Sequence, residues 1–109
     1  MQTVVETPSF IRSADKAGMT PAEREAAIGI VSANPAAGDI IAGGGGIRKV
    51  RVPMRGKGKS GGYRVLTYFM QADEPVFLLW VLVKSKQANL SDAQTTQLRQ
   101  LAKEIRGER

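Results

Sequence analysis

The chain of 109 residues has 16 lysines and arginines against 10 aspartates and glutamates, a net charge of +6, with neither histidine nor cysteine. Its length suits one hydrophobic core, so we expect a single domain over residues 1–109. The missing residue types exclude disulfides, thiolate zinc sites, a cysteine nucleophile and a histidine base. The longest apolar run, residues 76–83, is too short for a membrane helix of about 20 residues. No segment resembles a signal peptide, so we expect a cytoplasmic protein.

The first part of the chain predicts one short strand and two helices. Residues 3–6 are the strand. A helix opens at Thr7-Pro8 and stops at Gly18. The next begins at Thr20-Pro21, where a capping residue, a proline at the first helical position and a glutamate three residues after the cap coincide. That helix ends before Pro35, because proline cannot continue it.

The remainder predicts a glycine-rich flexible loop over residues 36–46 and then a small sheet. Residues 49–52 alternate apolar and cationic side chains, and residues 63–70 are largely apolar. Residues 76–83 contain no polar side chain, so this strand is expected to be central and covered on both sides. A capped helix over residues 91–107 follows. We therefore predict an α+β fold of two layers, with N-terminal helices and a C-terminal helix packed on a small antiparallel β-sheet.

The positive charge is concentrated in the second part of the chain. Residues 1–46 carry a net −2, which leaves +8 for the rest. Between Ile47 and Arg64 there is no acid, and the cations are Arg48, Lys49, Arg51, Arg55, Lys57, Lys59 and Arg64. Such asymmetry favours a polyanionic partner. The alternative is a solvated basic loop that only confers solubility.

The glycine-rich segment 56–61 imitates two nucleotide-binding motifs. It contains G-x-G-x-x-G, and its residues 58–60 are G-K-S, the tail of a phosphate-binding loop. Both motifs need a helix directly afterwards, whereas residues 63–68 read as a strand, and the first glycine of a Walker loop would fall on Pro53. We interpret the segment as a basic loop whose Lys57 and Lys59 could contact phosphates.

Three segments together resemble one protein family. They are G-I-R-K-V-R at 46–51, G-K-G-K-S-G-G-Y-R-V at 56–65, and V-K-S-K-Q-A-N-L-S at 83–91. Over residues 20–106 the chain resembles the RelE/HigB superfamily of type II toxins, and most closely its HigB-like branch. The resemblance implies a RelE/ParE-like fold and an mRNA interferase that cleaves messages on the ribosome. It also implies a cognate antitoxin as partner, expected on the basic face or a sheet edge.

RNA cleavage of this kind needs three things. The 2′-hydroxyl must lose a proton, the phosphorane must be stabilised and the leaving oxygen must be protonated. In the basic region only lysine, arginine and tyrosine are available, and we expect no metal and no cofactor. Arg64 is the expected phosphate clamp, and the family's catalytic arginine in the G-Y-R piece maps onto it. If the strand before them persists, Lys84 and Lys86 point to one face as an acid/base pair.

The RNA-binding residues are expected to surround this catalytic set. Lys49 and Arg51 project from the first long strand toward flanking phosphates. Tyr68 is the aromatic expected to stack on a base, whereas the other aromatics of the sheet are expected in the core. The full predicted set is Arg48, Lys49, Arg51, Arg55, Lys57, Lys59 and Tyr68.

The chain departs from RelE itself in two places. Ser85 stands where RelE has an arginine, and no tyrosine follows Tyr68, so the general base is not identified. Two other functions stay open. One is a ParE-like toxin that inhibits DNA gyrase, and the other is a basic RNA-binding module without catalysis, in which Lys84 and Lys86 only end a strand.

Overall fold

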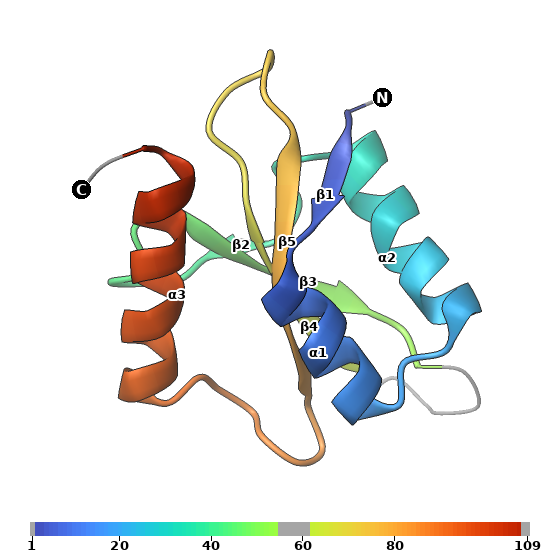
Figure 1. Ribbon diagram of the computed structural model, residues 1–109. Coiled ribbons are helices and arrows are strands. Elements are labelled where there is room, and N and C mark those ends of the chain that lie inside the picture. The colour runs from blue at the N-terminus through green and yellow to red at the C-terminus, as the bar shows by residue number, and fades with distance from the viewer. Residues whose placement is uncertain (1, 55–61, 108–109) are drawn as a thin grey trace.

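The computed structural model describes residues 2–54 and 62–107 of the chain. In chain order the elements are β1 (Val4–Glu6), α1 (Pro8–Ala17), α2 (Pro21–Ala33), β2 (Asp39–Ile40), β3 (Ile47–Val52), β4 (Tyr63–Tyr68), β5 (Val76–Val83) and α3 (Asp92–Ile105) (Figure 1). The α+β class is confirmed, together with all three predicted helices.

The helix ends follow the capping residues read from the sequence. Thr20 and Ser91 each form a capping box, in which the hydroxyl accepts the backbone N–H three residues on and that residue's side chain accepts the cap's N–H. Gly18 ends α1 with φ +76°, a left-handed conformation that glycine adopts without steric cost. None of the described helices is long and apolar enough to cross a membrane.

The sheet has the strand order β1-β5-β4-β3-β2. β1 pairs in parallel with β5, and the other pairs are antiparallel. The sheet is therefore mixed, whereas the sequence predicted an antiparallel one, because three residues of strand pattern carry no information on direction. β2 lies within the segment predicted as a flexible loop. β5 is covered on both faces as predicted, but β4 holds the central position.

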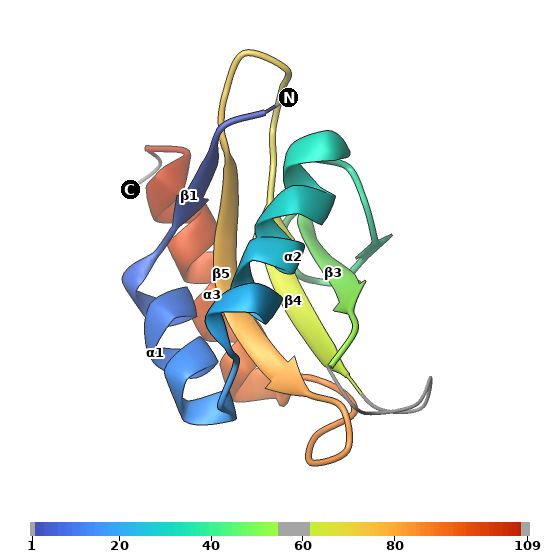
Figure 2. The ribbon, with the colours of Figure 1, turned by 90° about the vertical axis from the view of Figure 1, so that its right-hand side faces the viewer.

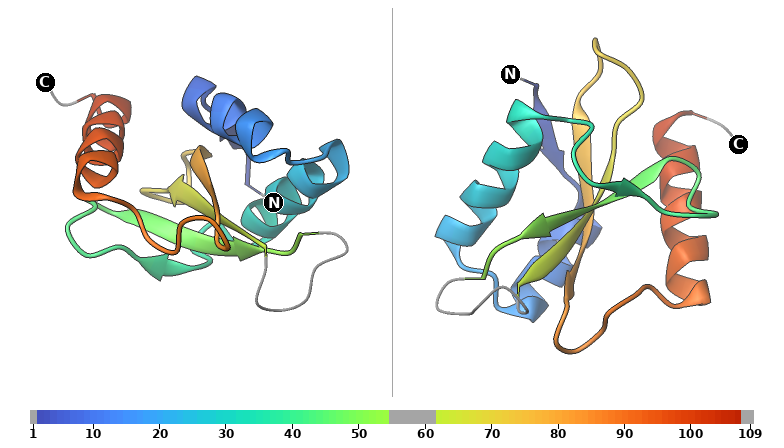
Figure 3. Two further views of the ribbon diagram at one scale, coloured as in Figure 1. Left: turned by 90° about the horizontal axis from the view of Figure 1, so that it is seen from below. Right: turned by 180° about the vertical axis from the view of Figure 1, so that it is seen from behind.

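Helices cover both faces of this sheet, which adds a layer to the predicted two. On one face, Phe10 and Ala14 of α1 and Ala27 and Val31 of α2 pack against β3, β4 and β5. On the other face, α3 contributes Leu98 and Ala102 to a second apolar cluster with Ile47, Leu66, Tyr68 and Leu82. Figure 2 shows α1 and α2 in front of the strands and α3 behind them. Figure 3 shows β3 and β4 running away from α3, so α3 covers only part of its face.

Helix α1 also covers the edge of β5 that β1 leaves unpaired. The Thr7 hydroxyl donates to the Leu78 carbonyl at 2.8 Å, and Ser9 donates to Leu79 at 2.7 Å. Further along, the Val81 N–H donates to the Ser13 hydroxyl at 3.0 Å. Hydroxyl groups thus replace a neighbouring strand as hydrogen-bond partners.

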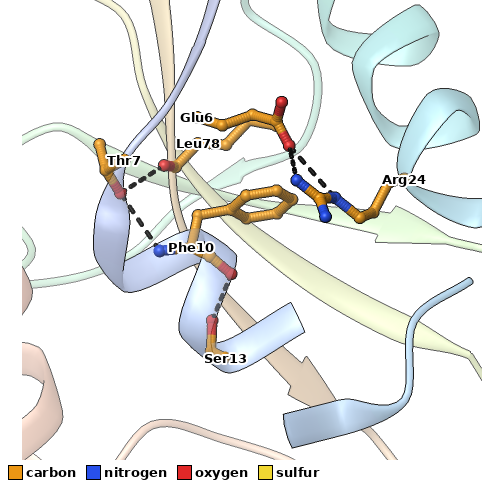
Figure 4. Close-up of polar contacts among 6 residues, drawn as sticks. All are labelled: Glu6, Thr7, Phe10, Ser13, Arg24 and Leu78. Carbon is orange, nitrogen blue, oxygen red and sulfur yellow. Dashed lines mark hydrogen bonds and ion pairs between the residues drawn. The ribbon is translucent and has the colours of Figure 1, made fainter. Parts of the chain in front are cut away.

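An ion pair fixes β1 to α2 on the same side of the molecule. Arg24 donates to Glu6 at 2.6 Å, and its guanidinium lies 6.0 Å from the centre of the Phe10 ring (Figure 4). Both charged side chains are partly exposed, so the pair contributes little to stability by itself. Its geometry nevertheless places α2 over Phe10 and completes the core on that face.

Candidate active site

A pocket of about 420 Å³ opens on the part of the sheet that α3 leaves uncovered. Among the described residues, four cations line it: Lys49 and Arg51 from β3, Arg64 from β4, and Lys84 just after β5. We call it the cationic pocket. Its other lining residues are Gly38, Asp39, Ala88 and Asn89.

Strand register explains why these cations meet. Lys49 and Arg51 share one face of β3 because side chains alternate along a strand. Arg64 is the cross-strand partner of Arg51, and Leu82 is the partner of Arg64 on the next strand. Lys84 lies two residues beyond Leu82, which makes it a diagonal neighbour of Arg64 on the same face. Four positive charges of described residues, from β3, β4 and the position directly after β5, therefore converge.

Arg64 is the most unusual member of the pocket. Its side chain is only 7% exposed, and its Nη1 donates to the carbonyl of Tyr63 at 3.2 Å. Burial, and then the positive charge of Arg51, lower the pKa of Arg64 below its ordinary value. Within the described parts of the chain no carboxylate forms an ion pair with Arg64. A buried cation without a paired acid is costly, and such groups gather at binding and catalytic sites.

The turn after β5 separates the two lysines that the sequence placed together. The strand ends at Val83, and residues 84–86 turn, with the Lys86 N–H donating to the Val83 carbonyl at 3.0 Å. Lys84 lines the cationic pocket, whereas Lys86 lines a different cavity beside α1. The condition for a shared face, a persisting strand, is not met, and the predicted acid/base pair of Lys84 and Lys86 is wrong in its geometry.

Asp39 borders the pocket and was missed by the sequence interpretation. It is the partner of Lys49 in the β2–β3 pair, within a segment expected to be a loop. Gly38 allows this close approach: it has φ +89°, and a Cβ there would collide with the Lys49 carbonyl. In the sequence, only the glycine directly before Asp39 could have indicated this pairing. A strand of two residues is too short to show an alternating pattern.

The comparison with known families adds a second, independent observation. The family model described as the RelE toxin of the RelE/RelB toxin-antitoxin system matches residues 2–108. The chain belongs to the RelE toxin family. This confirms the resemblance seen in the three basic segments and establishes the toxin role within a toxin-antitoxin system. The HigB-like branch stays a prediction.

Arg48, another predicted RNA-binding cation of this RelE-family toxin, lies away from the cationic pocket. Arg48 alternates with Lys49 and so lies on the opposite face of β3, where its Nη1 donates to the Ala36 carbonyl at 3.1 Å. Arg48 thus supports the segment before β2 and does not line the pocket. Arg55, Lys57 and Lys59 lie outside the described residues.

Tyr68 does not fit its predicted role in the RelE-family toxin. It is 4% exposed in the apolar cluster under α3. Its hydroxyl accepts a hydrogen bond from Arg106 at 3.0 Å, and the Arg106 guanidinium lies 5.7 Å from the ring centre. The ring therefore has no free face for a base. Trp80, which was expected in the core, is only half-buried and lines the cavities beside α1.

Proposed function

We propose that this toxin is a metal-independent endoribonuclease, an mRNA interferase that cleaves message on the ribosome at the cationic pocket. The observation that carries the proposal is the buried Arg64, directly opposite Arg51 and without an acidic partner among the described residues. Two guanidinium groups side by side repel each other, and a phosphate between them would relieve that repulsion. Membership of the RelE family supports the same reaction.

The proposed reaction uses only atoms of the RNA and side chains of the protein, and it balances as follows. The 2′-oxygen loses its proton and attacks the adjacent phosphorus, which forms a 2′,3′-cyclic phosphate. The bond from phosphorus to the 5′-oxygen breaks, and that oxygen takes up a proton. Arg51 and Arg64 hold the phosphoryl oxygens, whose negative charge grows in the transition state.

Lys84 is the proposed proton-transfer group. It is the pocket lysine diagonal to Arg64, and its backbone N–H is fixed by the Gly62 carbonyl at 3.1 Å. Asp39, on the β2 side, is the one carboxylate among the described residues that line the pocket. Lys86 has no catalytic role in this proposal, because it lines another cavity. Lys49 is assigned to flanking phosphates.

The proposed setting is the cytoplasm, with the ribosome, mRNA and a cognate antitoxin as partners. A pocket with few groups able to remove a proton is expected to depend on ribosomal RNA to align the strand for in-line attack. We therefore expect efficient cleavage of ribosome-bound message and little cleavage of the same RNA when free.

The experiment is primer extension on a message, programmed in ribosomes or free, with purified parent protein and Arg64→Ala. Arg64→Ala should cut about 100-fold more slowly, equivalent to about 2.7 kcal/mol of lost transition-state stabilisation. The matched control is Arg48→Ala, which removes the same charge from the opposite face of β3 and should cut at nearly the parent rate. Equal rates for parent and Arg64→Ala would refute the site.

Induction in cells separates the remaining functions. An interferase causes loss of message, a gyrase inhibitor causes DNA damage with intact message, and a non-catalytic RNA-binding protein leaves both intact. DNA damage without message loss would favour the ParE-like function and contradict the proposal.

A further inference from the structure

A groove with a different character from the cationic pocket lies between α1 and α3. Two adjoining cavities of about 300 and 150 Å³ share Arg12, Trp80 and Gln94 in their linings. Figure 1 shows α1 and α3 on either side of β5, which supplies the floor. We call these two cavities the α1–α3 groove.

The floor of the groove is apolar and its rim is basic. Trp80 and Val83 of β5, with Leu101 of α3, offer partly exposed apolar surface. Three further lining residues are exposed cations: Arg12, Lys16 and Lys86. No described acid lines either cavity. A concave apolar surface with charge of one sign around it fits an apolar side chain carried on an acidic segment.

One loop separates this groove from the cationic pocket. Lys84, Ala88 and Asn89 face the pocket, whereas Lys86 and Gln87 face the groove. The Gln87 amide donates to the Asn89 carbonyl at 2.9 Å and to the Gln94 side chain at 2.5 Å. A molecule in the groove that contacts Gln87 therefore contacts the same loop whose Asn89 lines the cationic pocket.

We propose that an acidic segment of the cognate antitoxin binds in the α1–α3 groove, with an apolar side chain against Trp80. It acts on the cationic pocket through the loop 84–90 and does not cover the pocket. The antitoxin is the chosen occupant because the chain belongs to a toxin family of a toxin-antitoxin system and because the groove complements an acidic, partly apolar partner. Only the effect on the pocket rests on the proposed function.

The test of binding is calorimetric titration of the full-length toxin with the purified antitoxin encoded beside it. Arg12→Glu should weaken binding by about tenfold or more. The matched control is Lys103→Glu, an equal charge change on α3 outside the groove, which should stay within about threefold of the parent. Lys16→Glu is the second groove variant should Arg12→Glu not fold, as judged by circular dichroism. Equal losses for groove and control variants, or no loss for either, would overturn the proposal.

A second experiment tests whether the antitoxin binds outside the cationic pocket. It uses Arg64→Ala and a short RNA with a 2′-deoxy substitution that blocks cleavage. Arg64→Ala should bind antitoxin as the parent does, and the toxin–antitoxin complex should still bind the RNA with altered affinity. Loss of antitoxin binding in Arg64→Ala, or strict competition between RNA and antitoxin, would place the antitoxin in the pocket. Weaker RNA binding by Arg12→Glu with unchanged antitoxin binding would instead make the groove an RNA surface. Because none of these readouts requires cleavage, failure of the nuclease function would be seen separately.

Discussion

The hydroxyl of Tyr63 donates a hydrogen bond of 2.9 Å to the carboxylate of Glu23, and both side chains are buried. This bond joins β4 to α2 through the core, on the face of β4 opposite to Arg64. The same Glu23 oxygen accepts the backbone N–H of Thr20 at 2.8 Å. One carboxylate thus caps α2 and orients the start of β4, the strand that carries the proposed phosphate clamp.

Tyr63→Phe should destabilise the fold by about 1–3 kcal/mol, because buried Glu23 loses a hydrogen-bond donor. Urea unfolding monitored by circular dichroism measures the loss. Glu23→Gln keeps an acceptor for the hydroxyl, so a double-mutant cycle with Tyr63→Phe isolates the part of the pair energy that depends on the carboxylate charge. Additive effects of the two substitutions would show that this charge contributes no coupling.

Tyr63 should also make stability depend on alkaline pH. Burial, and then the hydrogen bond and charge of Glu23, raise the pKa of Tyr63 from 10.0 to about 12. The folded state therefore binds the proton more tightly than the unfolded state. This contribution to stability is complete below pH 10 and is lost as the pH rises toward 12. Unfolding curves across this range should show a smaller decline for Tyr63→Phe than for the parent, and identical declines would contradict the assignment.

The pairing of Arg51 with Arg64 should lower the stability of the free protein and strengthen its binding of RNA. Like charges directly opposite on neighbouring strands are unfavourable, so Arg51→Ala should stabilise the free protein by about 0.5 kcal/mol at low salt. The same substitution should weaken RNA binding and reduce the slope of affinity against salt by about one ion. Thermal unfolding and a salt series of binding isotherms measure the two effects. A less stable Arg51→Ala would show that repulsion is already relieved in the free protein.

Lys84→Ala and Lys86→Ala should differ although they are two residues apart. Lys84→Ala should lower the cleavage rate on ribosome-bound message by about 100-fold and change the pH–rate profile. Lys86→Ala should change neither strongly, because its side chain lines the α1–α3 groove. Single-turnover cleavage across a range of pH compares them. A changed pH–rate profile in Lys86→Ala alone would move the proton-transfer role to that residue.

Gly38→Ala should displace β2 from β3. The position has φ +89°, and the added Cβ would collide with the Lys49 carbonyl. The strained conformation alone costs on the order of 1–3 kcal/mol. Hydrogen exchange should show lost protection in β2. The control is Gly29→Ala, in a helix with open space around the position, which should stabilise the protein by about 0.5–1 kcal/mol. Unchanged exchange in Gly38→Ala would show that β2 does not depend on this glycine.

Much of the fold follows from local chemistry that the sequence displays. Capping residues with prolines or glycines bound the helices, and alternation defines β3, because both signals act within a few residues of the chain. The strand direction of β1 and the pairing of β2 depend on contacts with residues far away in sequence. No local pattern encodes them.

The candidate site divides in the same way. The composition predicted a site built from cations, and the basic region with its G-Y-R piece predicted Arg64 as one of them. Which of the cations share a pocket depends on the tertiary structure. Because side chains alternate along a strand, Arg48 lies on the face of β3 opposite to Lys49. The turn after Val83 places Lys84 and Lys86 in different cavities. Long-range pairing brings Asp39 beside Lys49, and packing under α3 removes Tyr68 from solvent. These outcomes depend on how strands pair and where a strand ends, which the free energy of the whole fold determines.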